Sequence, residues 1–223
     1  SAGAIVGALY AGGISWEEML DFFKTTSIFQ TRKYARNKPG FVDTEKFYDD
    51  FKRLLPHDNF NALEKALYVT ATDIIKGSLK VFNSGELIAP VLASASFPGV
   101  FTPTKIANSH YIDGGVLNNF PVELLQPECS TIIGVYVNPL NTITPTDLKH
   151  SYNVVERAYK IKMAADSIIK FNACDIIISP LQLNTFNTFS MSKINEIFDI
   201  GYINAKRTIE TQLAQLRTKQ SII

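Results

Sequence analysis

Apolar residues near the start of the chain recur at helical spacing. Residues 2–11 are apolar on nearly every side, which predicts a buried helix that ends at a pair of glycines. Ser15 followed by Glu18 is a capping box and predicts an amphipathic helix that runs to about residue 26. A second amphipathic pattern predicts a helix over residues 43–55. The opening quarter of the chain is therefore expected to be mainly helical.

The pattern then changes to the β-branched and aromatic content that is typical of strands. Residues 66–75 and 79–83, joined by a Lys-Gly-Ser turn, predict a hairpin-like pair. Residues 86–95 predict a short helix that is broken near Pro90. Residues 110–113 predict a short strand that runs into a sharp turn.

Two fully apolar segments follow in the second half of the chain. Residues 131–138 and 174–179 predict strands that are buried on both faces of a parallel sheet. Residues 151–171 and 192–216 predict long helices. Strands that alternate with helices favour an α/β layer architecture with a mainly parallel sheet. No repeat, linker or low-complexity segment divides the chain, so we expect a single domain over residues 1–223.

Composition and charge exclude several classes of protein. Of the 223 residues, 46% are hydrophobic and 19% are charged, which excludes a disordered or fibrous chain. The formal net charge is +1 and no long Lys/Arg run occurs, so we expect no nucleic-acid partner. No apolar run reaches the ~18 residues that cross a bilayer. Any membrane contact is therefore expected to be interfacial, hydrophobic and local.

The two cysteines bear on metal binding and on compartment. Cys129 and Cys174 lie in or beside apolar strand-like segments without metal-ligand spacing, so we expect two buried free thiols, no disulfide and no metal. Free thiols favour a reducing, cytoplasmic compartment. No signal peptide is visible, but a targeting segment upstream of residue 1 would be absent from this sequence, so membrane-associated and secreted locations stay open.

The first residues of the chain carry the first candidate for chemistry. Ser1-Ala2-Gly3 resembles the second half of a nucleophile elbow, G-x-S-x-G, in which a serine occupies a tight turn from a strand into a helix. We attribute the flanking glycine to a close approach of neighbouring backbone. A helix that begins at Ala2 would aim its N–H groups and its positive dipole end at charge forming beside Ser1 Oγ. The alternative is that Ser1 is a simple N-cap.

A nucleophilic serine needs a base, and Asp113 is the best-placed candidate. It ends an apolar strand and is followed by Gly114 and Gly115, which lets the backbone turn away from its carboxylate. In open α/β sheets this strand end is where ligands bind. The alternative is a plain Asp-Gly-Gly turn. The three histidines, His57, His110 and His150, lack the context of a Ser-His-Asp triad.

Three sequence blocks, in this order and separation, resemble those of the patatin-like phospholipase family. They are residues 1–4 (SAGA), residues 93–103 (ASASFPGVFTP) and residues 113–121 (DGGVLNNFP). The segment FDIGY at residues 198–202 and its helix are similar to the family's C-terminal end. The pattern D-G-G-x-x-x-N-x-P is the most specific of these blocks, and the likeness covers nearly the whole chain.

The resemblance implies a fold, a chemistry and a pair of residues. The fold would be a three-layer α/β/α arrangement around a mainly parallel sheet. The activity would be hydrolysis of acyl esters of lipids, often phospholipids or lysophospholipids, without metal or cofactor. Ser1 matches the family's nucleophile and Asp113 its general base, and the reaction would pass through an acyl-enzyme. Because carboxylates are weak bases for a hydroxyl group, such a dyad depends on alignment and on oxyanion stabilisation.

One departure from the family concerns the oxyanion hole. The family's glycine-rich loop, G-G-G-x-[RK]-G, and the first strand precede the elbow and are absent from this sequence. The Ala2 N–H is then the one oxyanion donor at hand, and we expect the remaining donors in a segment upstream of residue 1. Loss of a single donor typically costs ~10²–10³ in rate, so residues 1–223 by themselves are expected to be nearly inactive.

Several alternatives stay open at this point. Ser1 taken as a mature N-terminus would be an N-terminal nucleophile whose own amine is the base. The absent glycine-rich loop would also fit a lipid-binding or storage domain without catalysis. Residues 16–55 would line an acyl-chain groove, touch a lipid surface or form ordinary core. Residues 27–40 are a solvated loop or a cover over the site.

Overall fold

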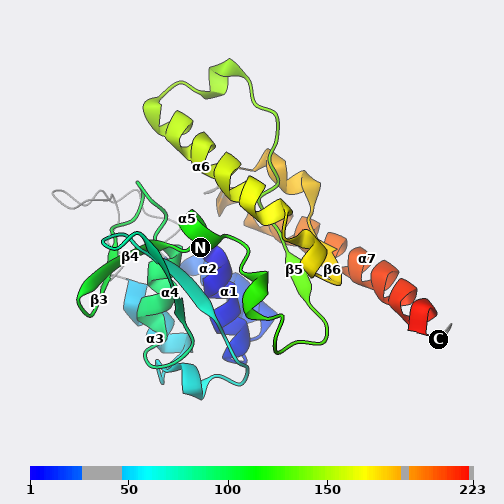
Figure 1. Ribbon diagram of the computed structural model, residues 1–223, viewed down its shortest axis with the longest axis horizontal. Helices are drawn as coiled ribbons and strands as arrows, with labels where there is room; N and C mark the ends of the chain where they lie inside the picture. Colours follow the sequence, from blue (N-terminus) through cyan, green and yellow to red (C-terminus); the bar gives the residue numbers. More distant parts are fainter. Residues whose placement is uncertain (27–46, 187–190, 221–223) are drawn as a thin grey trace. The chain divides into compact units, whose positions relative to one another are not determined.

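A computed structural model describes residues 1–26, 47–186 and 191–220 of the chain. They form two compact units, Ser1–Asn119 and Phe120–Ile223, which are described separately. Figure 1 colours the first unit from blue to green and the second from green to red. The loop or cover expected at residues 27–40 lies outside the described residues. The expectation of one domain over residues 1–223 stays a prediction.

Helices at the start of the first unit follow the patterns of the sequence. Ser15 accepts a hydrogen bond from the Glu18 N–H, and Glu18 accepts one from the Ser15 N–H, so the predicted capping box is confirmed. The predicted break near Pro90 is wrong: Pro90 is the third residue of its helix, where the missing N–H has no intrahelical partner in any case. The helices of this unit are α1 (Ala2–Ala11), α2 (Trp16–Thr25), α3 (Tyr48–Leu54), η3 (Phe60–Ala62), α4 (Ile88–Ala95) and α5 (Gly115–Asn118).

The sheet of the first unit has four strands in the order β2-β1-β4-β3. The strands are β1 (Val69–Asp73), β2 (Ser78–Phe82), β3 (Thr104–Ile106) and β4 (Ser109–Asp113). All neighbours pair antiparallel, with Asp73 opposite Ser78 in the predicted hairpin and opposite Tyr111 on β4. The α/β class is confirmed, whereas this sheet does not show the mainly parallel arrangement that we predicted. Short turns join β1 to β2 and β3 to β4, and such turns connect only antiparallel neighbours.

The core of the first unit lies between its helices, and α4 lies against the sheet. Ile5 and Leu9 of α1 pack with Val91 of α4 in one buried cluster, which also includes Phe22 and Phe51. The rings of Phe22 and Phe51 meet edge to face at 5.0 Å. In Figure 1, α4 lies beside β3 and β4. The described parts of the segment 16–55, residues 16–26 and 47–55, thus contribute to the core.

The second unit contains the parallel pairing that the apolar segments predicted. Its strands β5 (Ile133–Val135) and β6 (Ile176–Ile178) pair parallel, although β5 is shorter than expected and Ile133 and Val135 are exposed. Its helices are η4 (Val122–Leu124), η5 (Pro145–Asp147), α6 (Ser151–Ile168), η6 (Phe171–Ala173), η7 (Leu181–Thr185), η8 (Met191–Lys193) and α7 (Ile194–Gln220). Phe120, Ile132 and Tyr136 form its buried cluster. The three-layer arrangement stays a prediction.

Two expectations from composition concern the membrane and the thiols. Among the described residues, no helix is long and apolar enough to cross a bilayer. Cys129 and Cys174 are free, as expected. The expectation that both are buried is wrong, because Cys129 is exposed and Cys174 is only partly buried.

Candidate active site

Ser1 lies at the N-terminal end of α1, one residue before the helix begins. Its side chain forms no capping hydrogen bond, and it is 38% exposed. Buried Ile5 and Leu9 hold the helix against α4, so the position of Ser1 is set by packing one and two turns further along. The Ala2 N–H belongs to the first turn of α1, where N–H groups have no intrahelical acceptor. The positive end of the helix dipole is therefore beside the Ser1 side chain.

Asp113 is the last residue of β4, and its side chain is among the most buried of the described chain, with 1% of the residue exposed. Its Oδ1 accepts a hydrogen bond of 2.8 Å from the Gly115 N–H. The Asp113 main chain is held from two sides, since its N–H donates to the Ser96 carbonyl and its carbonyl accepts from Thr72 Oγ1, both at 3.0 Å. The carboxylate therefore has a fixed orientation.

The structure brings Ser1 and Asp113 together. The Ser1 main-chain nitrogen lies 3.3 Å from Asp113 Oδ1. The same nitrogen donates a 2.8 Å hydrogen bond to Oγ of Ser94, a buried residue of α4. Sequence reasoning did not single out Ser94. The block ASASFPGVFTP contained it, but nothing in the local pattern showed that this hydroxyl faces the start of α1.

The glycines that follow Ser1 and Asp113 differ in how closely other atoms approach them. A Cβ at Gly114 would lie 2.3 Å from the carbonyl oxygen of Thr70, so only glycine lets the chain after Asp113 pass this close to β1. Gly115 contributes its N–H to the carboxylate. A Cβ at Gly3 would meet nothing within 4 Å. The close approach that we expected at Gly3 is therefore not found among the described residues.

The three histidines and possible metal ligands of the described residues add no catalytic group to this site. The side chains of His57, His110 and His150 are all exposed. Over residues 1–26, 47–186 and 191–220, no group of three or more His, Cys, Asp or Glu residues is arranged to hold a metal ion. The groups described around Ser1 are thus the Asp113 carboxylate, the Ser94 hydroxyl and backbone N–H groups.

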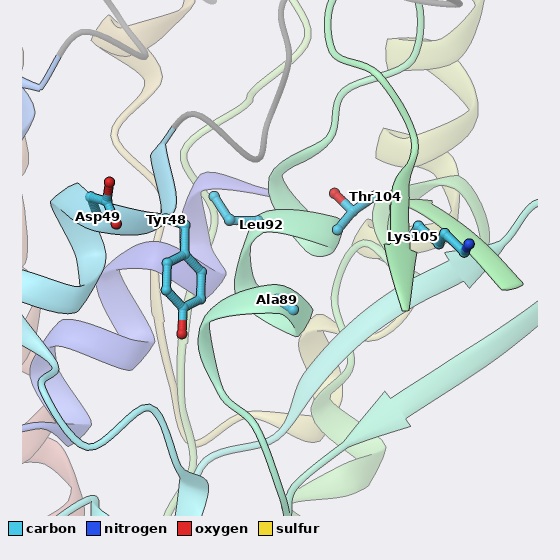
Figure 2. Close-up of a pocket in the computed structure, with 6 residues that line it drawn as sticks. All are labelled: Tyr48, Asp49, Ala89, Leu92, Thr104 and Lys105. Carbon is cyan, nitrogen blue, oxygen red and sulfur yellow. The ribbon is translucent and has the colours of Figure 1, made fainter. Parts of the chain in front are cut away.

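A pocket of about 290 Å³ lies elsewhere in the first unit. Figure 2 shows the residues that line it, which come from α3, α4 and β3: Tyr48, Asp49, Ala89, Leu92, Thr104 and Lys105. Neither Ser1 nor Asp113 is among these described lining residues. The Tyr48 hydroxyl donates a 2.6 Å hydrogen bond to Asp58 Oδ2, and this bond, with a contribution from burial, raises the pKa of Tyr48 to about 12.

Comparison with known proteins assigns the family. Residues 1–125 match the family model of patatin-like phospholipase, and this range includes both Ser1 and Asp113. The chain belongs to the patatin-like phospholipase family. The resemblance inferred from the three sequence blocks is confirmed.

Several curated relatives are similar to this patatin-like chain. An uncharacterized NTE family protein of Mycobacterium tuberculosis (strain ATCC 25618 / H37Rv) is 27% identical over 125 residues, or 55% of this chain and 34% of that protein. A probable lipid hydrolase of Invertebrate iridescent virus 6 is 36% identical over 105 residues, or 40% of this chain and 36% of the viral protein. A lysophospholipase NTE1 of Kluyveromyces lactis is 24% identical over 160 residues, or 60% of this chain and 11% of that protein. The chain spans about a third of the length of the first curated relatives that it matches.

Proposed function

We propose that this patatin-like chain carries the catalytic dyad of a lipid acyl hydrolase, with Ser1 as the nucleophile and Asp113 as the general base. The observation that carries the proposal is the 3.3 Å approach of Asp113 Oδ1 to the Ser1 nitrogen, because it brings a buried carboxylate next to the residue that bears the hydroxyl. The Ser1 side chain is 38% exposed and can therefore meet a substrate.

The reaction would proceed in two steps through an acyl-enzyme. Ser1 Oγ attacks the ester carbonyl carbon while Asp113 takes the hydroxyl proton, and the resulting tetrahedral intermediate collapses as the alcohol leaves with that proton. Water, deprotonated by the same carboxylate, then attacks the acyl-serine ester, and a fatty acid leaves as Ser1 Oγ regains a proton. The chemistry needs neither an oxidant nor a metal.

The start of α1 supports stabilisation of the oxyanion in both steps. The Ala2 N–H follows the nucleophile directly, and residues in this position contribute an oxyanion donor in nucleophile elbows. No residue of the first turn of α1 is itself acidic, and the carboxylate that lies at this end of the helix is that of the proposed base, Asp113. Preorganised donors at this position would stabilise the developing negative charge, and in acyl transfer such stabilisation commonly accounts for most of the rate enhancement.

The substrates that we propose are carboxylic esters of lipids, as in phospholipids and lysophospholipids. The family description names a phospholipase, and relatives carry the names lysophospholipase and probable lipid hydrolase. Leu92 and Ala89 give the pocket apolar walls, but neither Ser1 nor Asp113 lines it, so we do not assign the acyl chain to this pocket. The proposed substrate class therefore rests on the family.

Turnover of a soluble chromogenic acyl ester by the full-length protein tests the dyad. Ser1→Ala and Asp113→Asn should each reduce kcat by about 10³-fold or more, since members of a catalytic unit fail together. His110→Ala is the control and should retain most of the activity, because His110 is exposed. Retained turnover in either dyad variant would reject the proposal. Absent turnover in the wild type together with retained lipid binding would favour a non-catalytic lipid-binding domain.

The N-terminal nucleophile alternative receives less support from the arrangement around Ser1. That mechanism needs the α-amine as a base for the hydroxyl of the same residue. The Ser1 nitrogen instead donates to Ser94 Oγ and lies 3.3 Å from Asp113 Oδ1, and Ser1 precedes a helix. Intact-mass measurement of the mature protein decides between the two, because the alternative requires Ser1 to be the first residue after processing.

A further inference from the structure

Two turns of the first unit lie at the same end of its sheet, opposite to Asp113. The β1–β2 turn begins at Ile74, whose N–H donates a 3.0 Å hydrogen bond to the carbonyl of His110 near the start of β4. Lys105 of β3 lies opposite His110 in the antiparallel pairing of β3 with β4. Asp113 is at the other end of β4, three residues after His110, which places it roughly 10 Å from His110 at ~3.4 Å per residue. We call the surface formed by Ile74, Ile75, Lys76, Lys105 and His110 the isoleucine edge.

The isoleucine edge exposes two large apolar side chains at the tip of a turn. Ile74 is 48% exposed and Ile75 is 69% exposed. Gly77 continues the turn at φ +64°, and a Cβ there would meet nothing within 4 Å, so the turn projects into open space. Gly, Pro, Asn, Asp and Ser dominate turns, so two adjacent exposed isoleucines in this turn are unusual.

The turn is held rigidly in this exposed position. Asp73, which is 2% exposed, accepts hydrogen bonds of 3.0 Å from the N–H groups of both Ile75 and Lys76. Ser109 Oγ donates to the same carboxylate oxygen at 2.7 Å. Although burial acts to raise the pKa of Asp73, the hydrogen bonds from Ser109 and the backbone outweigh it and lower that pKa. The isoleucines are thus presented by a fixed frame.

Lysines lie near the exposed isoleucines. Lys76 and Lys105 are exposed, and Lys80 lies further along β2. Asp73 at the base of the turn is buried, and from residue 74 to residue 112 the one acidic residue is Glu86, which follows the end of β2 that is farther from the turn. Asp49 lines the pocket to which Lys105 also contributes. Figure 2 shows the Lys105 amine directed away from the Tyr48 ring. Apolar tips flanked by lysines match the chemistry of an anionic lipid surface.

We propose that the isoleucine edge docks the protein on an anionic lipid bilayer, with Ile74 and Ile75 inserted at the interface and Lys76 and Lys105 at the headgroups. The proposal goes beyond the proposed function, because it assigns a surface that is distinct from the dyad and that anchors the protein without taking part in the chemistry. Ile74 and Ile75 are not among the residues that line the described pocket, and two exposed apolar side chains at the tip of a turn next to lysines favour a lipid surface over a protein partner.

A second Ile-Ile-Lys sequence in the chain provides a matched control. Ile168 and Ile169 are 54% and 74% exposed and are followed by Lys170. The Lys170 amine forms an ion pair of 3.0 Å with Glu123, and the Lys170 side chain is 28% exposed. Lys76 also approaches a carboxylate, Asp73 Oδ2 at 3.9 Å, but its side chain is 72% exposed. The two sequences therefore share exposed isoleucines and differ in accessible positive charge.

Vesicle co-sedimentation of the full-length protein tests the proposal. The vesicles contain phosphatidylcholine alone or phosphatidylcholine with phosphatidylserine at a ratio of about 7:3. On the mixed, anionic vesicles each lysine at the surface should change the binding constant about fivefold. We expect binding to the anionic vesicles that weakens with salt. Lys76→Ala and Lys105→Ala should each weaken it about fivefold, and Ile74→Ser/Ile75→Ser should weaken it about tenfold or more. Ile168→Ser/Ile169→Ser should leave it within about twofold.

Activity measurements separate this proposal from the proposed function. Ile74→Ser/Ile75→Ser should retain turnover of a short soluble ester while its turnover of lipid in anionic vesicles falls in parallel with binding. Ser1→Ala should lose turnover and still bind vesicles, so failure of the dyad does not affect the binding result. Unchanged vesicle binding by Ile74→Ser/Ile75→Ser would overturn the docking proposal. Dissociation of a protein oligomer by the same variant, without a change in vesicle binding, would also overturn it.

Discussion

The Ser94 side chain accepts a 2.8 Å hydrogen bond from the main-chain nitrogen of Ser1, and Ser94 is 2% exposed. The contact joins the beginning of α1 to the last turn of α4. Together with Asp113 Oδ1 at 3.3 Å, it leaves the Ser1 main chain held by two buried side chains. A nucleophile is effective only when its approach to the substrate is well aligned, so Ser94 is expected to act as a positioning residue.

Removal of the Ser94 hydroxyl should lower the rate of the chemical step more than substrate binding. We expect Ser94→Ala to reduce kcat about 10- to 100-fold with little change in KM, because a misplaced nucleophile loses transition-state alignment. Ser94→Thr keeps the acceptor and should retain more activity. Steady-state kinetics on a soluble ester, with the full-length protein, measure both effects.

Ser96→Ala is the control for this experiment. Ser96 is also fully buried and donates a 2.7 Å hydrogen bond to the Leu92 carbonyl, but its side chain has no described contact with Ser1. Alanine keeps the main-chain carbonyl that accepts from the Asp113 N–H. Both alanine variants should lower the melting temperature to a similar extent. An equal loss of kcat in Ser94→Ala and Ser96→Ala would show that Ser94 has a structural role only.

Gly114 is expected to tolerate no side chain. A Cβ at this position would lie 2.3 Å from the Thr70 carbonyl oxygen, and a backbone atom of a central strand cannot easily move. Gly114→Ala should therefore lower the free energy of unfolding by about 3 kcal/mol, as measured by chemical denaturation. Gly3→Ala, where a Cβ meets nothing within 4 Å, should raise it by about 0.5–1 kcal/mol. Equal stabilities of the two variants would contradict this account.

Local patterns in the sequence predicted the elements that local chemistry determines. The capping box at Ser15 begins α2, and the Lys-Gly-Ser turn joins β1 to β2, because both depend on hydrogen bonds and conformations within a few residues. Asp113 was predicted at the end of a strand and is found there. The apolar run before Asp113 and the two glycines after it were sufficient to identify it as a candidate.

Features that depend on pairing between distant segments were not predictable in the same way. The five residues 109–113 are too few for their pattern to define the direction of a neighbouring strand. The mainly parallel sheet was inferred from the order of elements along the chain, whereas β4 pairs antiparallel on both sides. The role of Ser94 depends on how α1 packs against α4, which no short motif encodes. The strand directions and the role of Ser94 thus depend on tertiary packing, which local sequence patterns do not define.

Asp58 caps α4 and should contribute to the stability of the first unit. Its Oδ1 accepts hydrogen bonds from the N–H groups of Leu87 at 3.0 Å and Ile88 at 2.7 Å. Asp58 also has φ +42°, a conformation that Asn adopts more readily than Ala. Asp58→Ala should therefore lower the free energy of unfolding by about 1–2 kcal/mol, and Asp58→Asn should lower it by clearly less. Urea denaturation measures both, and an Ala variant as stable as the wild type would show that the cap is unimportant.

The hydrogen bond between Tyr48 and Asp58 should make stability fall at high pH. The pKa of Tyr48 is raised from 10.0 to about 12, chiefly because its hydroxyl donates to the Asp58 carboxylate. A group whose pKa is higher in the folded than in the unfolded state contributes stability that is fully present below the unfolded pKa and is lost as pH rises through the folded one. The free energy of unfolding of the wild type should therefore fall more steeply than that of Tyr48→Phe as the pH rises from 10 to 12.

Asp58→Asn removes the carboxylate charge and should return the Tyr48 pKa toward its ordinary value. An ultraviolet titration of the nine tyrosines would then show a smaller absorbance change at the highest pH values than in the wild type. Identical alkaline stability curves for the wild type and Tyr48→Phe would contradict this coupling.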